Sequence, residues 1–262
     1  MTSKLLVKQK DIVVPGEKLA QGLDFLPGER TYREGDYIVS SRLGLVSVEG
    51  RAVKIIKLGG KYIPKVGDRI IVKVFDITFS GWRVETNSAY SAMLSIAEAG
   101  DQFIPRNSDL TRFFNIGDYI LTKIKNITSQ NLIDISMKDR GLRKLGEGRI
   151  LSITPCKVPR VIGKNASMIS MIKDATGCRI TVGQNGLIWL NGEDPKMEFI
   201  ASKTIKKIEA ESHFSGLTDR IKEFLEKETG KKVVINTNPK PREDSRPKFE
   251  HRPQNKTFNR RR

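Results

Sequence analysis

The chain has 262 residues, of which 38% are apolar and 29% charged, and its formal net charge is +17. This composition excludes a membrane-spanning protein, because no apolar run approaches the roughly 18 residues that a span requires. No charged-then-apolar leader follows Met1, so we expect a soluble, cytoplasmic protein of two or three domains. Cys156 and Cys178 have neither CxxC spacing nor a histidine cluster nearby, so we expect no disulfide, no metal site and no cofactor.

The excess of positive charge favours an acidic polymer as partner, but the charge is spread unevenly. Counting Lys and Arg against Asp and Glu gives +4 for residues 1–64, +3 for 65–145 and +4 for 146–235. Residues 236–262 hold nine basic and three acidic residues among Pro and Asn, with few apolar side chains. Such a segment buries too little surface to fold, so we predict a disordered basic tail. Both a nonspecific RNA arm and a solubilising tail fit it.

Residues 1–64 are predicted to form a small β-domain. Short β-branched or alternating runs, among them 37–40, 44–48 and 53–56, are separated by Gly and Pro at regular intervals. This spacing is typical of short strands joined by turns. Nothing in this region has a catalytic pattern.

Residues 65–145 are predicted to form a second β-domain. Strand patterns cover 69–77 as the first strand, 81–85 as the second, 116–125 as the fourth and 132–136 as the last. A Val/Ile-Gly-Asp sequence comes before the first of these and opens the fourth. Five strands with a long connection between the third and the fourth describe an OB-type barrel, whose open face and loops bind oligonucleotides.

From about residue 146 to 235 the hydrophobic period changes from two to 3.6. A helix after Ala166 is predicted to end at Gly177, a hairpin follows over 179–190, and Asp194-Pro195 begins a further helix. One more helix is expected before Gly230. The predicted fold class is therefore multidomain and mainly β, followed by an α+β domain.

The loop Gly163-Lys164-Asn165-Ala166 has the pattern of the KH module, in which Gly-x-x-Gly lets the backbone approach single-stranded nucleic acid. Here Ala166 replaces the second glycine. If that position needs a positive φ, the alanine costs roughly 1 to 2 kcal/mol, and its methyl group stands where a sugar-phosphate would approach. The basic residues Arg160 and Lys164 beside this loop are candidates for RNA contact.

The order of these domains resembles the RNA-binding cap subunit of the archaeal exosome, the ribosomal RNA-processing protein four family. The resemblance covers residues 1 to about 235 and rests on three stretches in order. These are Val14-Pro15-Gly16-Glu17, then Gly28 to Tyr32 ahead of Ile38-Val39-Ser40-Ser41, and Gly183 to Trp189, whose first four residues look like that family's Gly-x-Asn-Gly signature. It implies a small N-terminal domain, an S1-type OB barrel and a KH domain. Ser95 departs from the pattern, because many S1-type barrels carry a base-contacting histidine there.

The resemblance also implies a function. In that family three non-catalytic cap subunits sit on a hexameric ring of phosphorolytic 3'-5' exoribonuclease subunits. The N-terminal domain docks on the ring, and the barrels guide single-stranded RNA into its entry pore for degradation and processing. The turn containing Gly183, Asn185 and Gly186 is thought to pack between barrel and KH domain, which implies a structural role for these residues.

The barrel offers further candidates for RNA contact. Trp82 on the second strand stacks a base if it faces outward and fills the core if it faces inward, and strand alternation places Arg83 on the opposite face. Arg106 and Arg112 lie in the long connection, where a guanidinium fork suits phosphate. Lys123 and Lys125 share one face of the fourth strand, as an RNA track or as an ordinary polar surface.

Two other classes of protein remain as alternatives. A transcription factor resembling NusA also has S1 then KH, but it adds a second KH domain and a helical N-terminal domain. A nuclease resembling polynucleotide phosphorylase has KH and S1 domains in the other order, behind catalytic domains that have no counterpart here. We therefore expect an RNA-binding subunit and not an enzyme.

Overall fold

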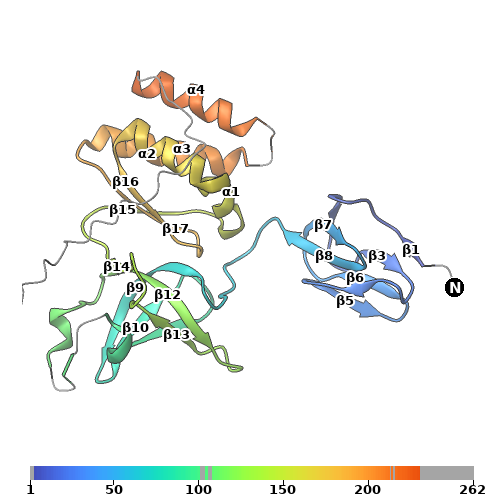
Figure 1. Cartoon of the computed structure of the whole chain (residues 1–262), viewed down its shortest axis with the longest axis horizontal. Helices are drawn as coiled ribbons and strands as arrows, with labels where there is room; N and C mark the ends of the chain where they lie inside the picture. The colour runs from blue at the N-terminus through green and yellow to red at the C-terminus, as the bar shows by residue number, and fades with distance from the viewer. Residues whose placement is uncertain (1–2, 101–103, 106–107, 213, 215, 231–262) are drawn as a thin grey trace, which may run out of the picture.

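The structure, a computed structural model, describes residues 3–100, 104–105, 108–212, 214 and 216–230. Three bodies follow one another along the chain, and an extended segment after the first leads to the second (Figure 1). The predicted disordered tail, residues 236–262, lies outside the described residues. In the described part, no helix is long and apolar enough to cross a membrane.

The N-terminal body consists of two four-stranded sheets that share one core. The first sheet has the order β1-β3-β6-β5 and the second the order β2-β7-β8-β4. The bounds are β1 Lys4–Leu5, β2 Ile12–Val13, β3 Lys18–Gln21, β4 Leu26–Pro27, β5 Thr31–Glu34, β6 Tyr37–Ser40, β7 Gly44–Glu49 and β8 Ala52–Lys57. Leu19 and Ile38 of one sheet and Val13, Val46 and Ile55 of the other form the buried cluster.

The second body is a closed barrel. Its strands are β9 Arg69–Thr78, β10 Gly81–Glu85, β11 Ser91–Ser95, β12 Tyr119–Ile127, β13 Ile133–Ser136 and β14 Arg143–Lys144. They follow the order β13-β11-β10-β9-β12-β14, and a further pairing of β12 with β13 closes the ring. Two short 3-10 helices, Ile96–Glu98 and Leu110–Arg112, lie in the connection from β11 to β12. Five strands that close in this way, with a parallel β11–β13 pair, confirm the predicted OB-type barrel.

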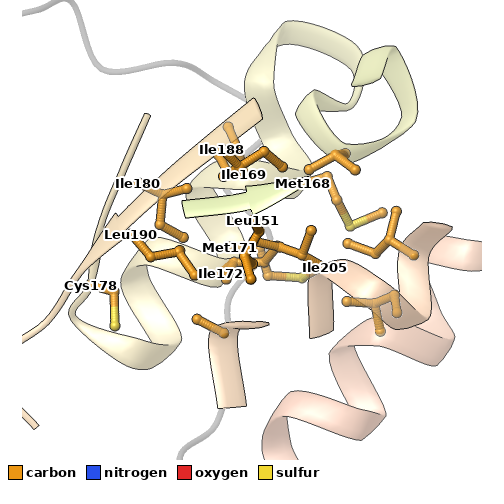
Figure 2. Packing of buried hydrophobic residues seen from close by; sticks show 14 of the residues in the cluster. Leu151, Met168, Ile169, Met171, Ile172, Cys178, Ile180, Ile188, Leu190 and Ile205 are labelled. Carbon is orange, nitrogen blue, oxygen red and sulfur yellow. The ribbon is translucent and has the colours of Figure 1, made fainter. Parts of the chain in front are cut away.

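The third body is a three-stranded sheet, ordered β15-β17-β16, with helices on one face (Figure 1). Its elements are β15 Arg149–Ser152, α1 Val158–Ile162, α2 Ser167–Thr176, β16 Arg179–Val182, β17 Leu187–Asn191, α3 Pro195–Ala210 and α4 Leu217–Thr229, with 3-10 turns at Pro155–Lys157 and Lys164–Ala166. Figure 2 shows how strand residues such as Ile180 and Leu190 meet helix residues such as Met171, Ile172 and Ile205 in its core. The fold class predicted from the sequence is confirmed.

The sheet of the third body also packs against the barrel. Ile71 of β9, Leu121 of β12 and Trp189 of β17 form one buried cluster together with Leu145. Trp189 is therefore part of the contact between the two bodies, and its Nε1 donates a hydrogen bond to the carbonyl of Gly146 at 3.2 Å. This contact fixes the barrel against the third body.

Candidate nucleic-acid interface

The turn between β16 and β17 inserts into the barrel. Strand β9 extends beyond its neighbour β10, whose last residue Glu85 pairs with Lys73, so the start of β9 has no strand partner on that side. Asn185 occupies this position. Its Nδ2 donates to the carbonyls of Ile71 at 2.7 Å and Thr86 at 2.8 Å, and its Oδ1 accepts from the Ile71 amide at 3.3 Å. The amide group thus replaces the missing strand.

The two glycines of the same turn are required by close backbone approach. A Cβ at Gly186, which has φ +84°, would lie 2.3 Å from the carbonyl oxygen of Ile153. A Cβ at Gly183 would lie 2.8 Å from the Ile71 nitrogen. Asn185 itself has no exposed surface. The location of Gly183, Asn185 and Gly186 therefore supports a structural role between barrel and third body.

Trp82 is a core residue of the barrel and not a stacking platform. Its side chain has 0% exposure, its Nε1 donates to the Phe114 carbonyl at 3.0 Å, and its ring meets the edge of the Phe114 ring at 5.1 Å between centroids. No face is open to a base, so the predicted stacking by Trp82 is not supported. Arg83 points outward, as alternation predicts, and lies over the Phe75 ring at 5.5 Å.

Three other aromatic residues of the barrel are exposed. Phe79 is 94% exposed in the turn between β9 and β10, and Phe75 and Tyr90 are also exposed. Phe75 could have been found from alternation, because it shares an outward phase with Lys73 while Val72 and Val74 face the core. Phe79 lies at a hairpin tip, where no partner strand covers it. These rings are the described barrel aromatics that a base can reach.

Of the basic residues predicted on the barrel, the four that the structure describes each lie beside a carboxylate. Arg83 is 4.0 Å from Asp76, Arg112 is 3.7 Å from Asp109, and Lys123 is 2.7 Å from Asp139. Lys125 and Lys138 both contact Glu98, at 2.9 and 3.5 Å. Local pairing therefore reduces the charge that this surface presents to a polyanion.

Glu98 is the best buried of these carboxylates, with 17% of its side chain exposed. Hydrogen bonds from Ser136 and Lys125 hold the pKa of Glu98 below its ordinary value of 4.5, and the charge of Lys138 adds to this effect. A lowered pKa means that the pairing is fully present above pH 4.5 and is lost as the pH falls through the lower folded value. Glu98 is therefore ionised at neutral pH and holds both lysines.

Arg106 lies outside the described residues, so its predicted contact stays a prediction. Arg160 on α1 and Lys164 after it are exposed beside the loop that precedes α2. In that loop Asn165 and Ala166 both have a positive φ, +52° and +61°. The strain expected at Ala166 is therefore present in the backbone, and its side chain packs against the core of the third body.

These features define a class of protein: a multidomain nucleic-acid-binding fold in which an OB-type barrel and a KH-type domain are fixed together. Residues 148–196 match the family described as "KH domain". Residues 12–49 match the family described as "Exosome complex exonuclease RRP4 N-terminal region". The first match lies within residues 146–235 and the second within residues 1–64.

Curated relatives cover most of the chain. It is 45% identical over 225 residues to "Exosome complex component Rrp4" of Thermococcus kodakarensis, an alignment that covers 85% of this chain and 87% of that protein. The protein of the same name from Methanothermus fervidus is 47% identical, with 84% and 97% covered. A solved structure, "Crystal structure of putative exosome complex RNA-binding protein", is similar with a TM-score of 0.59 and 36% identity over 64% of this chain and 97% of that chain. The chain belongs to the Rrp4 family of exosome components.

Proposed function

We propose that the chain is a non-catalytic RNA-binding cap subunit of an exosome. It docks through its N-terminal body on a hexameric phosphorolytic exoribonuclease ring, in three copies, and guides single-stranded RNA to the entry pore. The observation that carries this proposal is the similarity to exosome components over 85% of the chain. An OB-type barrel and a KH-type domain in one chain support the RNA-binding part of it.

Exposed apolar side chains of the N-terminal body support the docking. Of the 18 large hydrophobic side chains exposed in the described residues, ten lie before residue 65, although that region is about a quarter of the chain. Ile12 at 66% and Leu23 at 77% exposure are the largest of these. Where such side chains adjoin on one face they form an interaction surface, and we propose that the N-terminal body docks through them. An apolar partner surface on the ring would cover it.

The mass of the complex tests the docking. Mixed with the ring subunits, the chain is expected to give a native mass of one hexameric ring plus three copies. Leu23→Asp is expected to reduce incorporation, because it places a charge in the proposed contact. Leu132→Asp, at a similarly exposed position of the barrel, serves as the matched control and is expected to assemble normally. A chain that stays monomeric beside the ring contradicts the proposal.

The absence of catalysis is tested separately, since the matched N-terminal family carries the word exonuclease in its description. Purified chain incubated with labelled RNA, with phosphate or with Mg²⁺, is expected to leave the RNA intact. Phosphate-dependent shortening by the chain alone would contradict a non-catalytic role.

Releasing the lysines held by Glu98 is expected to strengthen RNA retention. Glu98→Gln keeps the shape of the side chain but removes the charge that binds Lys125 and Lys138. Since an exposed pair is worth up to about 1 kcal/mol, we expect the assembled complex to bind RNA roughly two- to fivefold more tightly at low salt. Fluorescence anisotropy across a salt titration measures this. Glu147→Gln, an exposed carboxylate without an ion pair among the described residues, is the control and is expected to have a smaller effect.

Ala166→Gly is expected to change RNA binding more than stability. Relief of the left-handed strain, roughly 1 to 2 kcal/mol, is offset by the buried methyl group and by the added freedom of the unfolded chain, each about 0.5 to 1 kcal/mol. The net change in the free energy of unfolding should therefore stay within about 1 kcal/mol. Removing the methyl group opens the loop to a sugar-phosphate, so RNA retention by the complex should rise. Unchanged retention would mean that this loop does not contact RNA.

A further inference from the structure

A groove of about 710 Å³ lies where the N-terminal body meets the barrel. The N-terminal body contributes Arg30, Arg42 and Lys57, the connecting segment contributes Lys61 and Ile63, and the barrel contributes Tyr90. We call this the junction groove. Its volume lies within the range of about 300 to 1,000 Å³ that is typical of small-ligand pockets.

The junction groove is positively charged without local compensation. Its lining includes four basic side chains and no Asp or Glu. Arg30 contacts Glu29 at 3.0 Å, but Lys65 shares that carboxylate at 3.5 Å. Within the described part of the chain, Arg42, Lys57 and Lys61 form no ion pair. Three cations therefore face the groove unneutralised.

The pKa of Lys57 is affected by its burial and by the neighbouring positive charges. Burial lowers the pKa of the Lys57 ammonium below its ordinary 10.5, and the charge of Arg30 lowers it further. Cys156 acts in the opposite direction, and Lys65 and Arg42 add smaller lowering effects. The Lys57 Nζ donates to the carbonyl of Lys61 at 3.1 Å, which does not remove charge. An anion in the groove would relieve the repulsion among these groups.

The predicted cations of the barrel surface that the structure describes are paired with carboxylates, unlike Arg42, Lys57 and Lys61 of the groove. On the barrel, Arg83, Arg112, Lys123 and Lys125 each lie within 4.0 Å of a carboxylate. A polyanion approaching the barrel must compete with those carboxylates, whereas in the junction groove it meets none. Compared with these four barrel residues, the groove is therefore the stronger phosphate site.

Other side chains that line the groove suit a base. Tyr90 is 43% exposed and Ile63 54% exposed, and both line the groove beside the amide-bearing Asn131. An aromatic ring can stack a base, and an amide can bond a base edge. A carboxylate-rich peptide would use the cations but would leave Tyr90, Ile63 and Asn131 without a role, whereas a nucleotide uses both sets of side chains.

We propose that the junction groove binds a nucleoside phosphate unit of single-stranded RNA, with the phosphates on Arg42, Lys57 and Lys61 and a base against Tyr90 and Ile63. This rests on the proposed RNA-binding function but places the contact away from the predicted barrel residues. A strand held there would pass between the N-terminal body and the barrel.

The test compares two variants of equal charge on the full-length chain. The groove variant is Arg42→Gln with Lys57→Gln and Lys61→Gln. The matched control is Lys8→Gln with Lys10→Gln and Arg51→Gln, three exposed cations of the same body outside the groove. The probe is a labelled single-stranded RNA measured by anisotropy over a salt titration. Wild-type binding should be detectable by about 0.1 mM protein at low salt, as is usual for nonspecific sites.

The groove variant is expected to lose at least fivefold in affinity, and the slope of log affinity against log salt should fall by about 2, since each phosphate contact on a single strand contributes about 0.7. The control should remain within twofold of wild type. Tyr90→Ala should weaken binding about fivefold or more without changing the slope, because stacking carries no charge. Groove-dependent competition by AMP would show that free nucleotides fit the same site, whereas no competition by AMP would assign it to the polymer.

Three results would overturn the inference. These are equal losses in the groove and control variants, no wild-type binding in that concentration range, and binding of a labelled hexa-aspartate peptide that depends on the groove while RNA binding does not. The last result would make the groove a protein-docking site. RNA retention by the ring-bound complex is measured separately, so failure of the groove does not remove the proposed cap function.

Discussion

Replacing Trp82 with alanine is expected to lower the free energy of unfolding of the barrel by about 3 to 5 kcal/mol. The side chain is fully buried, packs edge-to-face on Phe114 and donates its indole hydrogen bond to a backbone carbonyl. Alanine leaves a cavity and an unpaired buried carbonyl, and both costs add. Hydrogen exchange of the β9 and β10 amides measures the loss locally, which avoids assuming a single transition for a multidomain chain.

Phe79→Ala is the matched control, because it also truncates an aromatic side chain and lies only three residues from Trp82 in the sequence. Phe79 is almost fully exposed, so its replacement should change stability by no more than about 0.5 kcal/mol. RNA affinity should show the opposite pattern from stability. Phe79→Ala should bind RNA more weakly than wild type, whereas Trp82→Phe, as long as it is folded, should bind RNA as wild type does. A stable Trp82→Ala variant with weakened RNA binding would contradict the core assignment and restore the stacking role.

Replacing Asn185 is expected to loosen the contact between the barrel and the KH-type domain. Asn185→Ala removes the partners of the Ile71 amide, the Ile71 carbonyl and the Thr86 carbonyl. An unsatisfied buried group costs about 1 to 3 kcal/mol, and water entering the gap recovers part of this, so we expect a loss of roughly 2 to 4 kcal/mol. Faster exchange of the Ile71 amide and easier proteolysis between the two bodies report it.

Asn185→Asp sharpens the test. It preserves the size of the side chain but replaces the donor Nδ2 with an acceptor that faces two carbonyl oxygens. We expect it to be at least as destabilising as alanine, because a buried negative charge would face two carbonyl oxygens. Gln184→Ala is the control, since the contact of Gln184 with Arg69 is made by its backbone amide. A tolerated Asn185→Asp variant would show that the amide does not bridge the bodies.

Local signals in the sequence located much of the fold. Gly177 and Gly230 end α2 and α4 with positive φ, and the Asp194 side chain caps α3 in front of Pro195, as their residue types predict. The strand predicted at 37–40 has those bounds in the structure. In each case the interaction that sets the end of the element lies within a few residues of it, so the local sequence is enough to predict it.

The functional surface was harder to predict because its partners are distant in sequence. Lys125 is held by Glu98, 27 residues away, and Asn185 bonds Ile71, 114 residues away. Trp82 and Phe79 differ in burial because of barrel closure, which composition cannot reveal. The junction groove forms where the N-terminal body meets the barrel, so no single sequence motif predicts it.

The most direct test of the whole account compares RNA affinity of the isolated chain with that of the chain assembled on the ring, under the same salt titration. Weak sites gathered around one pore should act together, so we predict that the assembly binds at least about 100-fold more tightly than the single chain. Equal affinity of the isolated chain and the assembly would contradict the account.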